Sequence, residues 1–228
     1  INPNRDALLP LPHNKREVAQ ILSSFQGTSF IDKNASLLNF TNEYAKYNII
    51  HLATHAVFDD NAPEYSYLAF SNVDKQDDLL YVSDLYNLQI DADLVTLSAC
   101  ETGLGELKRG EGFLSLARGF FFSGASSIAS TLWKVNDASA TTVMSDFYSN
   151  LSEGNDKDVA LQKAKQKFLN TNRNNALAHP YFWSGFVISG NTASVAPNLN
   201  WNYIFYGIAA VVFISILFLF LRGRKSLK

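Results

Sequence analysis

The feature that most constrains the fold is an alternation of short apolar runs with segments of helical length. Three of the runs have the length of a strand: NIIHLAT (48–54), LVTLSA (94–99) and SSIASTLW (126–133). Segments of helical length lie at 35–47, 111–124, 137–151 and 156–170. Short apolar strands that alternate with helices are typical of a parallel sheet covered on both faces. The sequence therefore predicts an α/β fold with a mostly parallel sheet.

The N-terminal part of the chain continues this pattern. Asn14 followed three residues later by Glu17 resembles a capping box, and it predicts a helix through about residue 24. TSFI (28–31) is interpreted as a short strand. Two more short strands, at 67–71 and 79–82, are expected around the polar turn NVDKQDD, and HPYFWSGFVISG (179–190) supplies a final aromatic strand.

Two strands of the predicted sheet end in residues that can carry chemistry. The run NIIHLAT leads to His55, and LVTLSA leads to Cys100, the one cysteine of the chain. Sites in open α/β sheets form outside the carboxyl ends of the strands. A thiol beside a base can act as a nucleophile, and neighbouring strands lie about 4.8 Å apart. If the two strands are neighbours, His55 and Cys100 can converge; strand placement alone leaves a buried inert cysteine and a hydrogen-bonded histidine equally open.

Metal chemistry is not expected. His51 and His55 form H-x-x-x-H, but Leu52 stands where the metalloprotease pattern has glutamate. On a strand, residues four apart are about 13 Å from each other, too far to bind one ion. A single cysteine also excludes an intrachain disulfide and a cysteine-based zinc site. We expect no metal and no other cofactor, with His51 as a buried strand residue and His13 and His179 as surface or packing residues.

The glycine-rich segment after Cys100 does not fit a phosphate-binding loop. Glycines at 105 and 110 match half of the pattern, but Glu111 occupies the lysine position, and Glu101 and Glu106 add negative charge. The chain also has no G-x-S-x-G motif, so a serine hydrolase of the α/β-hydrolase type is not expected.

Charge is distributed unevenly along the 228 residues. Residues 1–200 hold 15 basic and 21 acidic residues, a formal net charge of −6, whereas the last 28 residues hold four basic residues and no acidic one. Phosphate neutralisation requires a basic surface, so nucleic acid is not expected as a partner of the main body.

Residues 203–221, YIFYGIAAVVFISILFLFL, predict a transmembrane helix. These nineteen uncharged residues span about 28 Å as a helix, close to the hydrocarbon thickness of a bilayer, and Trp201 and Tyr203 resemble an interfacial aromatic belt. A polar linker at 191–202 precedes the helix, and a basic tail at 222–228 follows it. The positive-inside rule predicts a cytoplasmic tail and an extracytoplasmic body; a tail-anchored protein with a cytosolic body is the alternative. Because the chain starts at Ile1, we expect a missing upstream region.

Several ordered blocks resemble the CHAT domain, a caspase-like and separase-like cysteine peptidase family. HLATHA (51–56) is similar to the histidine block of the family, and LVTLSACETGLGE (94–106) is similar to its cysteine block. The segments at 9–21, 110–137 and 179–190 resemble the opening, the helix and strand after the cysteine, and the terminal strand. The resemblance covers roughly residues 8–190, within a predicted domain at 1–190.

The resemblance implies a caspase-like three-layer α/β sandwich and a membrane-anchored cysteine endopeptidase that cleaves protein or peptide substrates. It implies His55 and Cys100 as the catalytic dyad, and the backbone N–H groups of Ala56 and Cys100 as oxyanion donors. Family members often carry tetratricopeptide repeats upstream, which implies regulation by the missing region, and the family and tail charges together favour a bacterial envelope protein. A non-catalytic scaffold at the membrane is the alternative function.

Substrate preference is left open by the sequence. Five acidic residues near the dyad are candidates to select a basic residue at the cleavage site, or are ordinary solvated or turn-forming residues: Asp59, Asp60, Glu64, Asp93 and Glu101.

Overall fold

The computed structural model describes residues 11, 13–59, 61–71, 78–98, 100–101 and 111–195. The chain divides into two compact units, Ile1–Ala196 and Pro197–Lys228, and the described residues all belong to the first. Within these described ranges, no helix has both the length and the apolar character needed to span a bilayer. The predicted membrane helix at 203–221 and the basic tail lie outside the described residues.

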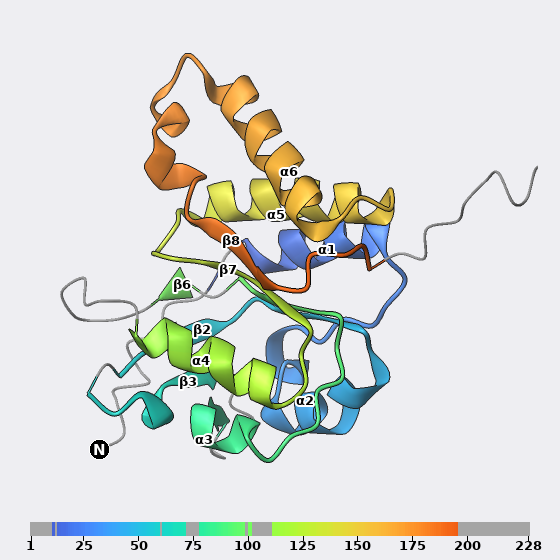
Figure 1. Ribbon diagram of the computed structural model, residues 1–228, viewed down its shortest axis with the longest axis vertical. Helices are drawn as coiled ribbons and strands as arrows, with labels where there is room; N and C mark the ends of the chain where they lie inside the picture. Colours follow the sequence, from blue (N-terminus) through green and yellow to red (C-terminus); the bar gives the residue numbers. More distant parts are fainter. Residues whose placement is uncertain are drawn as a thin grey trace, which may run out of the picture. The chain divides into compact units, whose positions relative to one another are not determined.

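Among the described residues, eight strands form two four-stranded sheets; Figure 1 shows β7 beside β8 of the first sheet and β2 beside β3 of the second. The first sheet has the order β1-β5-β7-β8, formed by β1 (Ile49–Leu52), β5 (Leu94–Leu97), β7 (Ser127–Thr131) and β8 (Phe186–Gly190). Its first three strands are parallel, and β8 runs antiparallel to β7. The predicted mixed α/β fold with a mostly parallel sheet is therefore confirmed.

The second sheet has the order β4-β3-β2-β6. It is formed by β2 (His55–Val57), β3 (Tyr67–Ala69), β4 (Leu79–Tyr81) and β6 (Cys100–Glu101). Two stretches of chain pass from the first sheet into the second: β1 continues into β2 after two residues, and β5 continues into β6. Both pairs, β1 with β5 and β2 with β6, are parallel.

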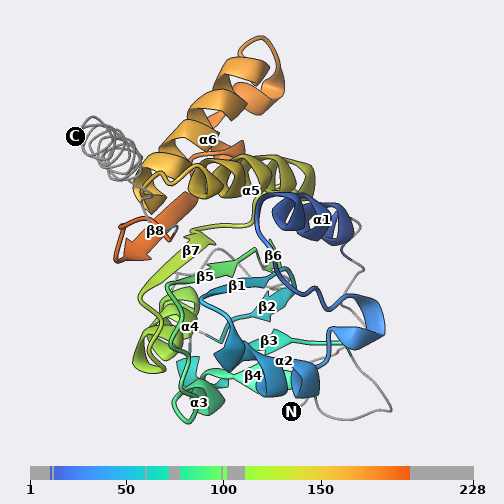
Figure 2. The same cartoon turned by 90° about the vertical axis from the view of Figure 1, so that its right-hand side faces the viewer.

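Helices lie on both sides of the strands, as Figure 2 shows. One side carries α1 (Asn14–Ser24), α5 (Asp137–Ser152) and α6 (Lys157–Asn172), and the other carries α2 (Leu37–Glu43), α3 (Val82–Leu85) and α4 (Glu111–Phe122). Alternation along β5 explains this division, because Val95 packs in the core beside α4 whereas Leu94 packs in the core beside α5. Five short 3₁₀ helices complete the described elements: Asp32–Asn34, Tyr44–Lys46, Pro63–Tyr65, Ala176–Ala178 and Pro180–Phe182.

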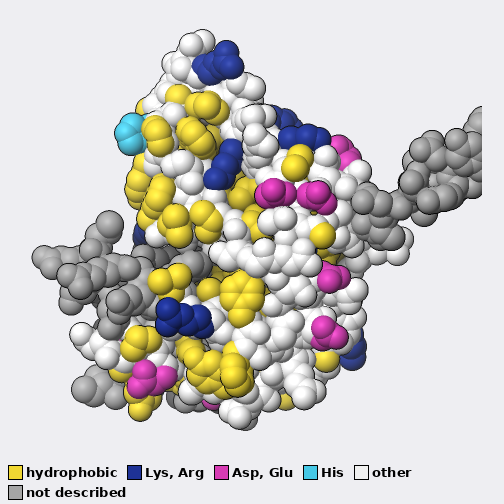
Figure 3. All heavy atoms as spheres, viewed as in Figure 1, with side chains coloured by type: hydrophobic (Ala, Val, Ile, Leu, Met, Phe, Trp, Pro, Cys, Tyr) yellow, Lys and Arg dark blue, Asp and Glu magenta, His cyan; other side chains and the backbone are white. Residues whose placement is uncertain are grey.

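Apolar side chains also gather on the surface over α4 (Figure 3). Phe122 of α4 is 70% exposed and contacts the exposed ring of Tyr86 edge-on, with ring centroids 5.0 Å apart. Leu114 and Phe121 of the same helix are also exposed.

Three local predictions are corrected by the structure. The helix at 14–24 forms, but its N-cap is His13 without a side-chain cap, and Glu17 is buried instead of completing a capping box. Residues 28–31 are not a strand, because no strand of the described residues pairs with them. The aromatic stretch at 179–190 is a strand only from Phe186 onward, since Pro180–Phe182 forms a 3₁₀ turn.

Candidate active site

The two predicted dyad residues lie side by side on neighbouring strands. His55 begins β2 and Cys100 begins β6, and the parallel register pairs His55 directly with Cys100. Paired positions on adjacent strands are about 4.8 Å apart. The condition that the sequence left open, that the two strands are neighbours, is therefore met.

The backbone around His55 is held on its other side by β3. His55 pairs with Ala69 across the antiparallel β2–β3 ladder, and the neighbouring Thr54 hydroxyl donates a hydrogen bond to the Ala69 carbonyl. His55 itself is half-buried, and its Nδ1 atom is buried. The backbone that carries His55 is thus paired along both edges of β2.

Ala56, the predicted oxyanion donor, lies inside this ladder. It pairs with Leu68 of β3 and with Glu101 of β6, and it is 1% exposed. Because Ala56 has a paired strand on each side, an oxyanion could reach its N–H group only within the sheet. The oxyanion roles of Ala56 and Cys100 stay predictions.

A buried polar network lies between the first sheet and the helices α1 and α5. Its four side chains come from four elements: Glu17 of α1, His51 of β1, Thr96 of β5 and Tyr148 of α5. His51 Nε2 lies 3.0 Å from Glu17 Oε1, and His51 Nδ1 lies 3.1 Å from the Tyr148 hydroxyl. That hydroxyl donates to Thr96 Oγ1 at 2.8 Å. The prediction that His51 is a buried strand residue is confirmed, since its side chain is only 9% exposed.

Tyr148 is fully buried in this network. Burial raises the pKa of the Tyr148 phenol well above its ordinary range, although the hydrogen bond to Thr96 acts in the opposite direction. Its ring packs edge-on against Phe25, Phe147 and His51, with centroids 5.5–6.0 Å apart. The phenol is therefore neutral, and its hydroxyl is held in place by the packing of its ring.

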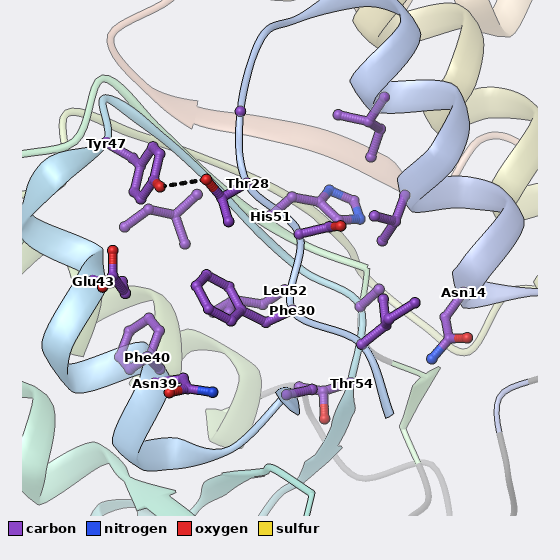
Figure 4. Close-up of a pocket in the computed structure, with 18 of the residues that line it drawn as sticks. Asn14, Thr28, Phe30, Asn39, Phe40, Glu43, Tyr47, His51, Leu52 and Thr54 are labelled. Carbon is purple, nitrogen blue, oxygen red and sulfur yellow. Dashed lines mark hydrogen bonds between the residues drawn. The ribbon is translucent and has the colours of Figure 1, made fainter. Parts of the chain in front are cut away.

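A cavity of about 1020 Å³ adjoins β1 and reaches His55. Its walls are α1, α2, β1 and the extended segment at 26–31. In Figure 4, the rings of Phe30 and Phe40 lie together beside Leu52, and the Tyr47 hydroxyl donates to Thr28 Oγ1 at 2.8 Å. Apolar side chains thus gather in one part of the cavity, and polar residues such as Asn14, Asn39 and Thr54 line it as well.

The remaining histidines have local roles. His13 is the N-cap residue of α1, and the exposed His179 uses Nδ1 to accept a hydrogen bond from the Tyr181 N–H. Within the described ranges, no group of three or more His, Cys, Asp or Glu side chains could hold a metal ion.

Two of the five acidic candidates have defined structural contacts. Asp59 accepts hydrogen bonds from the N–H groups of Asn61 and Ala62 and so forms a turn. The carbonyl of Asp93 accepts from the Ser127 hydroxyl at 2.6 Å. Glu64 lies exposed in a 3₁₀ turn. Asp60, the side chain of Glu101 and the glycine-rich segment 102–110 lie outside what the structure describes.

The sequence predicted His55 and Cys100 at the ends of two strands, but they begin β2 and β6, just after β1 and β5 end. The fold and this pairing define the class: a mixed α/β domain that presents a histidine and a cysteine at matched positions of two parallel strands. Residues 2–191 match the CHAT domain family, and the chain belongs to that family. The CHAT domain is related to the caspase-like cysteine peptidases.

A longer human protein contains a related segment. Over 116 residues the chain is 30% identical to Tetratricopeptide repeat protein 28 from Homo sapiens. The match covers 51% of this chain and 4% of that relative, so the chain corresponds to a small part of the relative's length.

Sequence reasoning missed the network around His51. The motif H-x-x-x-H drew attention to this histidine, but only as a possible metal ligand. A signal was present in Glu17, an acidic residue on the apolar side of the first helix near Ile21. A carboxylate at a core position calls for a buried partner, and a histidine in a buried strand can supply one.

Proposed function

We propose that the chain is the peptidase part of a cysteine endopeptidase that cleaves protein or peptide substrates with a Cys100–His55 dyad. The observation that carries this function is the register that pairs His55 with Cys100 on adjacent parallel strands. Membership of a caspase-like family supports it. The cavity that reaches His55 offers space beside this histidine.

The chemistry follows from the two groups. His55 takes the thiol proton, and the Cys100 thiolate attacks the carbonyl carbon of the scissile peptide bond. The C–N bond then breaks, and the imidazolium returns its proton to the leaving amine, which leaves a thioester on Cys100. A water molecule, deprotonated by His55, attacks the thioester; the acid product leaves and the thiol is restored.

Thiol labelling tests the dyad directly, because Cys100 is the only cysteine of the chain. We expect iodoacetamide to alkylate the folded chain at pH 6 at least about tenfold faster than the His55→Ala variant, since one unit of lowered thiol pKa gives about ten times more thiolate. Cys100→Ala should remove labelling and should lower cleavage of a peptide library by about a thousandfold or more.

His179→Ala is the matched control, because it removes an exposed histidine that caps a turn. This variant should be labelled at the wild-type rate. Equal labelling of wild type, His55→Ala and denatured chain would show that the dyad does not exist, and it would favour a non-catalytic scaffold.

We further propose that residues 203–221 anchor the peptidase in a membrane, with the body extracytoplasmic and the tail cytoplasmic. The nineteen uncharged residues and the basic tail support this arrangement. The name of the human relative refers to tetratricopeptide repeats. It supports an upstream repeat region that regulates the peptidase in the full-length protein, which we infer to be bacterial.

A further inference from the structure

The two chain segments that lead to the dyad, β1 into β2 and β5 into β6, are paired twice in the same register. In the first sheet His51 of β1 pairs with Thr96 of β5. Four residues further along each strand, His55 pairs with Cys100 in the second sheet. Contacts that hold His51 opposite Thr96 therefore also determine that His55 and Cys100 come to lie opposite each other.

Tyr148 joins the first pair from outside the sheet. Its hydroxyl lies 3.1 Å from His51 Nδ1 and donates to Thr96 Oγ1 at 2.8 Å, so one oxygen bridges β1 and β5. The side chain belongs to α5 and is fully buried. The tyrosine ring is rigid, so the hydroxyl oxygen that bridges β1 and β5 has a fixed position once the ring is packed.

Glu17 holds the imidazole from the opposite side. Its Oε1 lies 3.0 Å from His51 Nε2, and the two side chains are only 5% and 9% exposed. The second carboxylate oxygen accepts a hydrogen bond from the Thr141 hydroxyl of α5 at 3.5 Å. His51 thus forms a hydrogen bond at Nδ1 and a 3.0 Å contact without hydrogen-bond geometry at Nε2, and turning the ring would lose both.

These contacts penalise a shift between the two strands. A slip of one residue moves a strand by about 3.3 Å and turns each side chain to the opposite face. It would break the hydrogen bonds of the Tyr148 hydroxyl with His51 and Thr96 at a buried site, at a cost of about 1–3 kcal/mol for each polar group left unpaired. Apolar side chains at these positions would stabilise the fold without selecting one register so strongly.

We propose that the Glu17–His51–Tyr148–Thr96 network is a positioning device: it fixes the register of β1 and β5, the strands that continue into β2 with His55 and β6 with Cys100. This role rests on the peptidase function proposed above. The four residues are positioning residues, because they act on the dyad through the strands and touch no reacting atom.

A pair of substitutions at Thr96 separates positioning from packing. Thr96→Val keeps the volume but removes the hydroxyl, whereas Thr96→Ser keeps the hydroxyl but removes a methyl group from a fully buried site. Displacing reacting groups by about 1 Å can cost a hundredfold in rate. We expect Thr96→Val to lower the His55-dependent alkylation rate of Cys100 by about tenfold and to move its pH profile toward that of His55→Ala. Thr96→Ser should stay within about twofold of wild type.

Tyr148→Phe, which keeps the ring and removes the bridging oxygen, should behave like Thr96→Val. Ser123→Ala is the matched control, because it removes a buried hydroxyl that donates to the Phe120 carbonyl on α4, away from the network. It should leave the alkylation rate unchanged. The opposite order at Thr96, with serine impaired and valine normal, would mean that the site serves packing alone and would overturn the proposal.

Amide hydrogen exchange separates failure of the network from failure of the dyad. In Tyr148→Phe and Thr96→Val, the amides of β2 and β6 should exchange faster than in wild type, while those of α6 remain protected. Unchanged exchange in β2 and β6 would overturn the positioning role even if Cys100 is reactive. Faster exchange without any His55-dependent reactivity in wild type would retain the register role and reject the peptidase.

Discussion

Buried polar side chains are the residues whose roles depend most on their neighbours. Glu17 has the spacing of a capping box, yet its carboxylate lies 3.0 Å from His51 Nε2 inside the domain. A local pattern cannot reveal this partner, because His51 is far away in sequence and is brought close only when α1 packs over β1. The same applies to His51, whose burial was predicted correctly but whose contacts with Glu17 and Tyr148 were not.

Ionisation of Tyr148 should make the domain sensitive to alkali. Burial raises the pKa of this phenol in the folded chain, so the unfolded chain, with an ordinary tyrosine pKa of about 10, loses its proton first. The stabilising contribution is therefore complete below pH 10 and is lost as the pH rises above 10. We expect the free energy of unfolding of wild type to fall by up to about 1.4 kcal/mol per pH unit more than that of Tyr148→Phe.

Urea unfolding between pH 8 and pH 11.5 measures this difference. Ser123→Ala is the control, because the hydroxyl that it removes is buried but stays un-ionised in this pH range. This variant should show the wild-type pH dependence. Parallel curves for wild type and Tyr148→Phe would contradict the burial of a neutral phenol at this position.

At the scale of elements, periodic segments were predicted well and short unpaired ones were not. The helices expected at 137–151 and 156–170 form as Asp137–Ser152 and Lys157–Asn172, because an apolar face repeated over several turns is a local signal. The strand expected at 28–31 does not form, since a strand also needs a neighbour at hydrogen-bonding distance. Composition alone does not supply that neighbour.

The end of β8 depends on a glycine. Gly190 has φ +91°, and a Cβ atom there would meet the Ser126 carbonyl oxygen and the ring of Phe121. We expect Gly190→Ala to lower the free energy of unfolding by about 2–4 kcal/mol, because it combines left-handed backbone strain with a clash against backbone. Urea unfolding at pH 7 provides the measurement.

Gly154, which has φ +85° in the turn after α5, provides the comparison. Gly154→Ala should cost only about 1 kcal/mol, the strain of the backbone conformation. If the two variants lost similar free energies of unfolding, the contacts of the added Cβ atom with Ser126 and Phe121 would contribute nothing beyond the backbone strain.

At the scale of the whole molecule, the decisive event is the meeting of two distant segments. The histidine and cysteine blocks were each placed at a strand end from sequence. Their pairing depends on two features: β1 and β5 are neighbours in the first sheet, and both segments continue in parallel into β2 and β6 of the second sheet. Strand order is set by packing among all elements, so no single segment encodes it.

The proposed anchor is also a property of the whole chain. We expect the 228-residue chain to float with liposomes in a density gradient, and a chain ending at residue 195 to stay in the soluble fraction, because burial of nineteen uncharged residues is strongly favourable in a bilayer. A chain ending at residue 221 keeps the apolar segment without the basic tail, and it should still float. A full chain that remains in the soluble fraction would contradict the membrane anchor.

The sequence by itself determined the class of fold, the positions of the longer helices and the two candidate dyad residues. These depend on local periodicity and on motifs that are short enough to be read directly. Only the tertiary structure decided that His55 pairs with Cys100, that Glu17 contacts His51, and that Tyr148 bridges β1 and β5. The physical reason is that register and burial are relations between segments far apart in the chain, and they are fixed only when the sheet and its covering helices pack together.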